Sequence, residues 1–266
     1  MNLGVDINDK LNFSLISNYY TSASQGFDGS LLFNGLNYAP TYGTDEDDTT
    51  NFLGIEVVNP LSLLKNTYGE NNGNGIEGNF QLNYKPIEGL SVTSRLGYKI
   101  YNEKQRSFTP IQDYGASKVY NKTQSSVYQF KATSTRVNWE TFATYEKTFG
   151  EGHNTSFTLG TSVQNDLFDG IYATGVDVPN NSYEFADLSL TNSQSEQRSL
   201  NSGNGDTRLT SYFGRIQYDY NGKYLFSGLI RRDGASVFAA DKRVDNFWSV
   251  TTGWKISDED FLKDNS

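Results

Sequence analysis

Hydrophobic and polar residues alternate one by one over long stretches of the chain, and residues 78–100 show this most clearly. Before a turn at "PIEG", Phe80 and Leu82 alternate with amide side chains, and after it Leu96 and Tyr98 alternate with Arg95 and other polar residues. A period of two residues is that of a β-strand. Proline and glycine between two such runs favour a turn, so this stretch is predicted to be a β-hairpin.

The same pattern recurs along the chain and predicts about nine strands, all antiparallel. Further hairpins are expected over residues 3–20, turning near Asp9-Lys10, over residues 135–166, and over residues 208–234. The last of these turns on Asn221-Gly222, a strong hairpin signal. A final strand is expected over residues 245–256. Only "SLLFNGLNY" and "PLSLLKN" indicate helices, each of a turn or two.

One side of the hairpin at residues 78–100 is apolar along its whole length, and the other predicted strands alternate in the same way. We expect these side chains to share one face of a curved sheet and to point outward from it, toward lipid. The residues expected there are Phe80, Leu82, Leu96, Tyr98, Val137, Trp139, Leu159, Ile216 and Tyr218. The alternative is a large soluble β-sandwich, in which the same residues would be buried beneath a second sheet.

The connections between the strands favour the membrane alternative. The strands are expected to run for about 10 to 14 residues, and a tilted strand needs about 9 to 11 to cross a bilayer. Turns within hairpins are short, whereas residues 21–75, 108–134, 169–205 and 235–244 read as long polar loops, all at the other end. Short turns at one end and long loops at the other are the layout of an outer-membrane barrel.

Aromatic residues support the same interpretation, because several gather near the short turns on or close to the apolar side. An aromatic belt at a membrane interface produces such a pattern. The residues concerned are Tyr84, Tyr145, Phe149, Tyr218, Tyr220, Tyr224 and Trp254.

Composition removes several function classes. The net charge of −9 disfavours nucleic acid as a partner, and the absence of cysteine excludes thiolate metal sites. His153 is the only histidine, so neither a zinc site nor a Ser-His-Asp triad is expected. The acidic run at residues 44–50 is expected to be a solvated loop rather than a calcium site, and "NNGNG" at residues 71–75 a flexible loop. We therefore predict no enzyme activity and no cofactor.

Several motifs resemble one known family. "RRDGAS" at residues 231–236, the strand "FWSVTTGW" at residues 247–254 and "ISDEDF" at residues 256–261 follow one another in its order. Upstream, "NPLSLLKN", "NYKPIEGLSVTSRLGY" and "NWETFATYEKTFG" resemble further elements of that family. It comprises the SusC/RagA-type, TonB-linked (TonB-dependent) outer-membrane transporters of the Bacteroidetes, and the resemblance covers nearly the whole chain.

The resemblance implies a fold and a function. Such proteins resemble one another in having a barrel of about 22 strands with a plug inside it. They import glycans or peptides with energy from the TonB complex, beneath a SusD-like surface lipoprotein. The chain shows neither a recognisable plug nor a TonB-contacting segment. Residues 1–266 are therefore expected to be a middle segment of such a barrel, located in the outer membrane, without the plug and the remaining strands.

The candidate functional residues lie on the polar side of the predicted strands, which would line the lumen. They are Arg95, Lys99, Glu140, Arg215, Gln217, Asp219, Arg231 and Asp233. Arg231 and Asp233 are expected to brace a loop or a plug through ion pairs. The aromatic residues of the long loops suit stacking on sugar rings, packing on a lid protein, or small loop cores. These are Tyr38, Tyr42, Phe52, Tyr68, Tyr114, Tyr120, Tyr172 and Tyr183.

A second function class stays open from the sequence alone. A soluble β-rich module that binds carbohydrate or mediates adhesion would use the same aromatic residues as core and as binding platform. Dependence on detergent separates the two classes, because a soluble module stays monodisperse without it.

Overall fold

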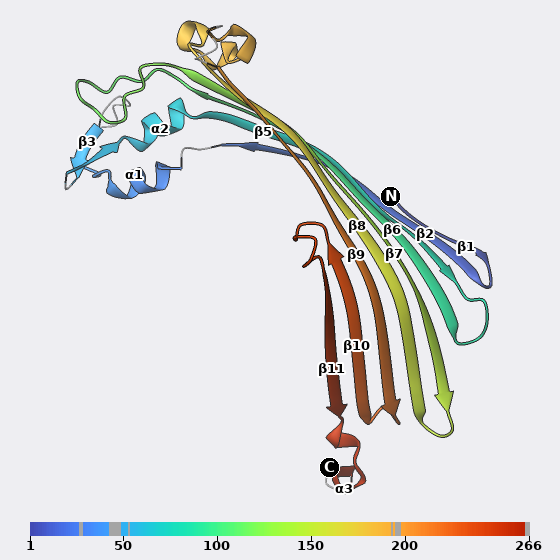
Figure 1. The fold of residues 1–266 in the computed structure, drawn as a ribbon. Coiled ribbons are helices and arrows are strands. Elements are labelled where there is room, and N and C mark those ends of the chain that lie inside the picture. The colour runs from blue at the N-terminus through green and yellow to red at the C-terminus, as the bar shows by residue number, and fades with distance from the viewer. Residues whose placement is uncertain (27–28, 43–48, 53, 193, 195–197, 264–266) are drawn as a thin grey trace.

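A single antiparallel sheet of nine strands forms the body of the protein in a computed structural model (Figure 1). The structure describes residues 1–266 except 27–28, 43–48, 53, 193, 195–197 and 264–266. Strands follow one another in chain order across the sheet, so the topology is a meander. The strands are β1 (Asn2–Asn8), β2 (Leu11–Gln25), β5 (Tyr68–Tyr84), β6 (Leu90–Thr109), β7 (Ser126–Phe149), β8 (His153–Val176), β9 (Arg198–Tyr220), β10 (Tyr224–Ala235) and β11 (Val244–Trp254).

The remaining elements lie at the ends of this sheet, as Figure 1 shows. The connection between β2 and β5 holds α1 (Leu31–Asn37), the small hairpin β3 (Thr49–Phe52) and β4 (Ile55–Val58), and α2 (Pro60–Asn66). Three 3₁₀ turns follow β8, namely η1 (Pro179–Asn181), η2 (Tyr183–Phe185) and η3 (Leu188–Leu190). After β11 come η5 (Ile256–Asp258) and α3 (Asp260–Lys263). Both short helices predicted from the sequence are thereby confirmed. Most of the acidic run at residues 44–50 lies outside the described residues.

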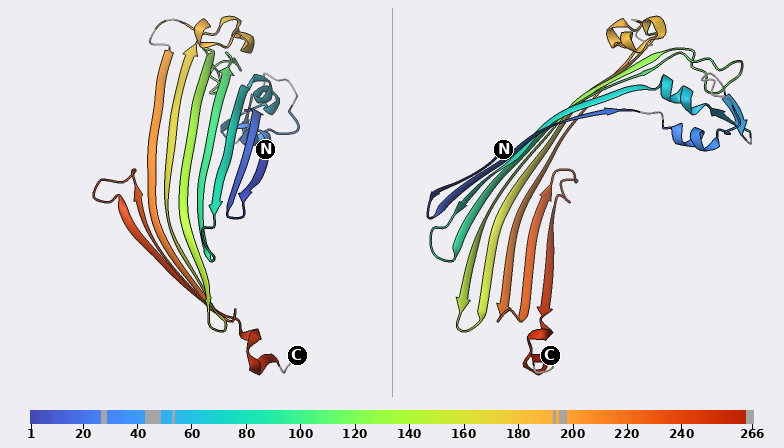
Figure 2. Two further views of the ribbon diagram at one scale, coloured as in Figure 1. Left: turned by 90° about the vertical axis from the view of Figure 1, so that its right-hand side faces the viewer. Right: turned by 180° about the vertical axis from the view of Figure 1, so that it is seen from behind.

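The strands twist together into a curved sheet, with every short turn at one end (Figure 2). The helices α1 and α2 and the 3₁₀ turns after β8 lie at the other end, whereas η5 and α3 follow β11 at the short-turn end. The turn between β9 and β10 is of the predicted kind. Asn221 and Gly222 have φ of 52° and 64°, and the Lys223 N–H donates to the Tyr220 carbonyl at 2.9 Å. Such left-handed pairs match the twist of a hairpin.

A neighbouring short turn fits against this one. Gly152, with φ of 83°, accepts a hydrogen bond at its carbonyl from the Asn221 N–H at 2.7 Å. A Cβ at Gly152 would collide with the Asn221 side chain, so glycine is required there both for its φ and for space.

Six of the nine strands, β2 and β5 to β9, are longer than the 10 to 14 residues predicted from the sequence, and for them this part of the prediction was wrong. β7 and β8 each contain 24 residues, and strand structure extends well into the stretches that read as loops. "NNGNG" at residues 71–75 lies inside β5 and is not a flexible loop. At these positions both sides of the strand are polar, so alternation is lost, yet the backbone stays paired with its neighbours.

The predicted apolar face is confirmed by the register. Phe80 pairs with Leu96, which pairs with Trp139, and Tyr98 pairs with Val137, so these side chains share one face. On the neighbouring strands Leu159 follows the same parity. The face is uncovered there, with Leu159 71% exposed and Phe80 37% exposed. Among the described residues, the only other sheet is the small hairpin β3–β4, so no second sheet covers this face.

The apolar face is a band of limited height, bounded by polar residues. It runs from Leu90 to Ile100 in β6 and from Tyr145 to Thr135 in β7, close to the 9 to 11 residues that cross a bilayer. Toward the long loops the same face becomes polar and charged, as at Lys104. The extra strand length therefore lies beyond the band, at the long-loop end.

The aromatic residues expected near the short turns lie at the corresponding border of the band. Tyr84, Tyr145, Phe149, Tyr218, Tyr220, Tyr224 and Trp254 all have the parity of the apolar face. Tyr220 stacks on Tyr224 with ring centroids 6.3 Å apart, and His153 Nδ1 lies 2.8 Å from the Tyr218 hydroxyl. The predicted aromatic residues therefore gather on the apolar face at the short-turn end, with ring contacts among His153, Tyr218, Tyr220 and Tyr224.

A small hydrophobic core lies at the long-loop end, where the 3₁₀ turns fold back onto β5, β6 and β7. Phe108 and Val127 are buried there with Val178 and Ala186. Tyr183 stacks on Tyr68 at 5.3 Å, and burial raises the pKa of the Tyr183 hydroxyl. These two loop tyrosines therefore belong to a loop core, one of the roles left open by the sequence.

One carboxylate attaches the C-terminal segment to the turn between β9 and β10. Glu259 accepts hydrogen bonds from the Tyr224 hydroxyl at 2.6 Å, the Trp254 indole N–H at 2.9 Å and the Lys223 ammonium at 3.1 Å. These bonds, with that from Tyr224 the largest, lower the pKa of Glu259 to about 2. The "ISDEDF" motif thus ties η5 and α3 to the β9–β10 turn.

This carboxylate predicts a pH dependence confined to the C-terminal segment. Because the folded-state pKa of Glu259 lies below its ordinary value of 4.5, the stabilising effect of this carboxylate is complete above that value and is lost as pH falls through about 2. We expect deuterium uptake of residues 255–263, corrected for the intrinsic rate, to rise only toward pH 2. Glu259→Gln should raise this uptake already at pH 7. Glu151→Gln, in another short turn, is the matched control, and equal uptake in both variants would contradict the assignment.

Candidate functional site

The polar residues selected from the sequence all lie on one face of the sheet, opposite the apolar band. Arg95 pairs in register with Glu140, and Lys99 has the same parity four residues along β6. The register of β8, β9 and β10 places the remaining candidates on the same face as Arg95. The residues brought to this polar face are Arg95, Lys99, Glu140, Arg215, Gln217, Asp219, Arg231 and Asp233. They form three groups rather than one cluster.

The first group is centred on Arg95, near the middle of β6. Its Nε donates to Gln81 Oε1 at 2.8 Å, and its Nη1 lies 3.7 Å from Glu140 Oε2. The guanidinium lies over the Phe142 ring at 5.2 Å. The Arg95 and Glu140 side chains remain 41% and 33% exposed, so both charges keep part of their hydration.

The next row toward the loops adds charges that the sequence analysis missed. Lys99 Nζ lies 3.7 Å from Glu77, and opposite Lys99 in register stands Arg136. Arg136 holds Asp166 with both Nε and Nη2, at 2.5 and 3.3 Å. These residues stood at the borders of the expected strands, where pattern is weakest. Extending the alternation of polar-face positions in β7 from Glu140 by two further alternate residues would have identified Arg136.

A depression in the polar face adjoins this row. Its lining includes Lys99, Arg136, Asp166 and the aromatic rings of Tyr101 and Phe168. Gly205 of β9 is the register partner of Phe168 and also lines the depression. Charged groups beside uncovered rings can bind polar ligands weakly and exchange them.

The second group is Arg231 with Asp233. Arg231 Nε donates to Asp233 Oδ1 at 2.6 Å, and Arg231 Nη2 donates to the Ser211 hydroxyl at 2.8 Å. The ion pair lies within β10, and the hydrogen bond to Ser211 joins β10 to β9. The expectation that these residues brace a loop or plug is untested, since the contacts in the structure are within the sheet.

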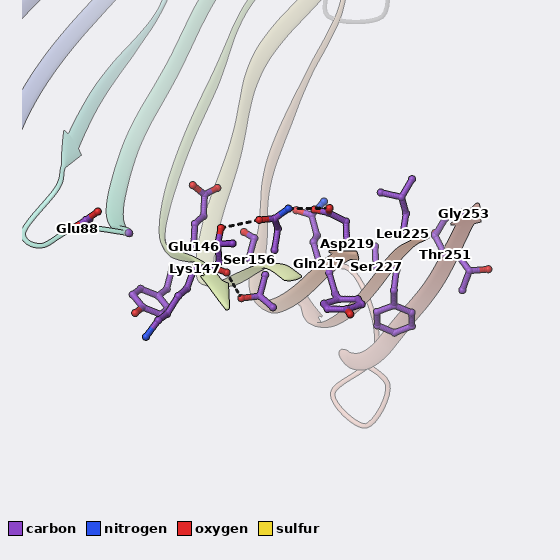
Figure 3. Close-up of a pocket in the computed structure, with 18 residues that line it drawn as sticks. Glu88, Glu146, Lys147, Ser156, Gln217, Asp219, Leu225, Ser227, Thr251 and Gly253 are labelled. Atoms are coloured by element: carbon purple, nitrogen blue, oxygen red, sulfur yellow. Dashed lines mark hydrogen bonds between the residues drawn. The ribbon is translucent and has the colours of Figure 1, made fainter. Parts of the chain in front are cut away.

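The third group lies at the short-turn end and lines an open hollow (Figure 3). Gln217 and Asp219 face it together with Ser227, and Arg215 Nε donates to the Ser227 hydroxyl at 3.3 Å. Asp219 accepts from Asn154 Nδ2 at 3.0 Å and from the Gly222 N–H at 2.8 Å. Asp219 therefore stabilises the β9–β10 turn, whatever else it contacts.

A separate pocket lies at the long-loop end of the polar face, beneath α2. Its floor is made of polar-face positions of β5 and β6, including Asn71 and Gln105. Leu63 and Asn66 of α2 and the ring of Tyr120 complete the lining. Amides, hydroxyls and a phenol are suited to hydrogen bonding with a neutral polar ligand.

The described residues of the polar face do not form a metal site. Among the described residues, no group of three or more histidine, aspartate or glutamate side chains could hold a metal ion. His153 lies in the aromatic row on the other face of the sheet. In the described part of the chain, no helix is long and apolar enough to cross a membrane.

The curated proteins to which the chain is similar are TonB-dependent receptors. No family model matches the chain. The chain is 29% identical over 244 residues to TonB-dependent receptor P3 of Formosa agariphila. The aligned region covers 90% of this chain and 23% of that relative. The chain is also 29% identical over 208 residues to TonB-dependent receptor SusC of Bacteroides thetaiotaomicron, in an alignment that covers 77% of the chain and 19% of the relative. The chain thus spans about a quarter of the length of such relatives.

Solved structures show the same fold. The RagAB peptide transporter superposes with a TM-score of 0.76 at 16% sequence identity, over 98% of this chain and 30% of that one. The RagAB peptide importer in an open state gives a TM-score of 0.78 at 17% identity. The resemblance that the motifs indicated and the all-β barrel fold are thereby confirmed. The curated relatives are receptors and not enzymes, in agreement with the function class expected from the sequence.

The partly hydrated Arg95–Glu140 pair predicts a small coupling energy. In a double-mutant cycle of Arg95→Leu and Glu140→Gln, we expect a coupling of about 0 to 1 kcal/mol in the free energy of unfolding, as for other exposed ion pairs. Arg95→Leu alone should be mild. The measurement is heat or urea unfolding of the purified receptor in detergent. A coupling of several kcal/mol would show that this face is dry and tightly packed.

Proposed function

Since this chain resembles the SusC/RagA-type TonB-dependent receptors over nearly all its length, we propose that it forms part of the barrel wall of an outer-membrane transporter. The apolar face contacts lipid and the polar face lines the transport path. Residues 1–266 then make up one segment of the barrel domain, with the plug and the other strands supplied by the rest of the receptor.

The contrast between the two faces of the sheet supports this proposal most directly. On one face, residues such as Leu96 and Leu159 form an apolar band about as tall as a bilayer. On the other, Arg95, Glu140 and Arg136 form hydrated ion pairs at the same height. A soluble β-sandwich would cover the apolar face, whereas here it is exposed.

The transported substrate is proposed to be a glycan or a peptide. The depression beside Lys99 and the pocket beneath α2 both combine hydrogen-bonding groups with aromatic rings, which suits either class. The relative RagAB is a peptide transporter, which supports the peptide class by analogy.

The partners follow from the same family analogy. We propose that a SusD-like surface lipoprotein closes over the long-loop end, where α1, α2 and the 3₁₀ turns lie. Energy would come from the TonB complex through N-terminal parts of the receptor outside this chain. The apolar band contacts outer-membrane lipid.

Substitutions at Leu96 test which medium the apolar face contacts. Lipid accommodates a larger apolar side chain, whereas a close-packed core resists it at a cost of about 1 to 3 kcal/mol. In the full-length receptor we expect Leu96→Phe to assemble as well as the wild type, with equal resistance to heat. Leu96→Arg should cost about 2 to 4 kcal/mol, because it places a charge within the band.

The readout is the heat-resistant folded fraction in the membrane, measured by electrophoretic mobility. Leu96→Arg alone does not discriminate, because a soluble core also penalises a buried charge. The matched comparison is Leu96→Ala. A loss of folded protein for Leu96→Phe as large as that for Leu96→Ala would mean that a packed core covers this face, and the membrane assignment would be wrong.

A further inference from the structure

Two lysines stand directly opposite each other on the side of the sheet that bears the apolar band, just beyond the long-loop border of that band. Lys104 of β6 and Lys131 of β7 are register partners with the parity of Leu96 and Trp139. Both side chains are exposed. Within a sheet, side chains in this relation are about 4.5 to 5.5 Å apart at Cβ, and like charges so placed are destabilising.

Acidic residues lie close to this pair, since Asp169 and Glu103 line the same hollow. In the part of the chain that the structure describes, neither lysine forms an ion pair. Glu70 is held by Arg106 at 2.8 Å. Asp169 pairs in register with Thr133, one step along the face from Lys131.

The surface around the lysines is a hollow with a fixed polar floor. Its lining includes Lys104, Lys131 and Asn102. Thr133 Oγ1 donates to Asn102 Oδ1 at 2.9 Å, and Asn102 Nδ2 donates to Asn74 Oδ1 at 3.1 Å. Tyr19 and Ile171 supply apolar edges. The hollow therefore combines two lysines, the carboxylates of Asp169 and Glu103, oriented amide and hydroxyl dipoles, and apolar borders.

The position of the hollow matches a lipid headgroup layer. Lys104 lies four residues beyond Ile100, where the apolar band ends in β6, which is about 13 Å along the strand. A tilt of about 45° reduces this to about 9 Å above the hydrocarbon. Lysine side chains reach several ångströms back toward that border while their ammonium groups stay hydrated. The ammonium groups therefore lie at the depth of headgroup phosphates.

We propose that Lys104 and Lys131 bind the phosphate-bearing headgroup of a membrane lipid in the leaflet on the long-loop side. The phosphate lies between the two ammonium groups and relieves their repulsion, and the acyl chains run along the apolar band below. The inference rests on the proposed membrane location of the sheet. A lipid is favoured over a soluble anion because the hollow is continuous with the band.

Lipid retention by the full-length receptor tests the proposal. The receptor in detergent is incubated with phosphatidic acid, or with diacylglycerol as the matched lipid without phosphate, and bound lipid is counted by native mass spectrometry. Lys104→Gln with Lys131→Gln should weaken phosphatidic acid binding about 30-fold, and Lys131→Gln alone about 5-fold. Diacylglycerol should bind weakly to every form.

Lys118→Gln with Lys122→Gln, in the loop between β6 and β7, makes the same change of charge away from the hollow and should leave binding unchanged. Wild-type binding by the Lys104/Lys131 variants, an equal loss in the Lys118/Lys122 control, or equal binding of diacylglycerol would each overturn the proposal. The heat-resistant folded fraction is measured in parallel. Assembly of these variants with lost lipid binding supports the site, whereas a receptor that never enters the membrane contradicts the proposed function instead.

Discussion

The antiparallel hydrogen-bond register is the constraint on which the rest of this structure depends. Because side chains alternate along a strand, one uninterrupted register from β2 to β11 fixes which residues share a face. A slip of one residue in β6 would move Arg95 into the apolar band and Leu96 to the polar face. Short turns such as Asn221-Gly222 pin that register at one end, and Glu259 ties the last strand to it. The two faces, and the functions proposed for them, follow from it.

The fold could be predicted from the sequence where one side of a strand is apolar. Residues 78–100 gave both strands, their turn and their faces correctly, because alternation there is complete. The prediction failed where both sides of a strand are polar, as in residues 71–75, which lie within β5. There the strand is stabilised by pairing with β2 and β6, and pairing between distant segments leaves no local pattern in the sequence.

The candidate site was predicted in part, for the same reason. Parity placed Arg95, Glu140 and Arg231 on one face correctly, since each lies in an alternating stretch. It did not show that Arg136 and Asp166 complete the central row, because partners on adjacent strands depend on register. The contacts of Tyr183 with Arg106 at the loop core were also not predictable, since a loop has no period that fixes its fold.

The central claim is that adjacent residues of one strand face lipid and water in turn. The chain contains no cysteine, so single cysteines can be placed at successive positions from Val92 to Ile100 of β6 in the receptor. Each is then treated in the membrane with a charged, water-soluble maleimide. The account predicts rapid labelling at Arg95 and Lys99 and slow labelling at Val92, Ser94, Leu96, Tyr98 and Ile100, which have the parity of the apolar face. Uniform labelling, or the reverse alternation, would contradict it.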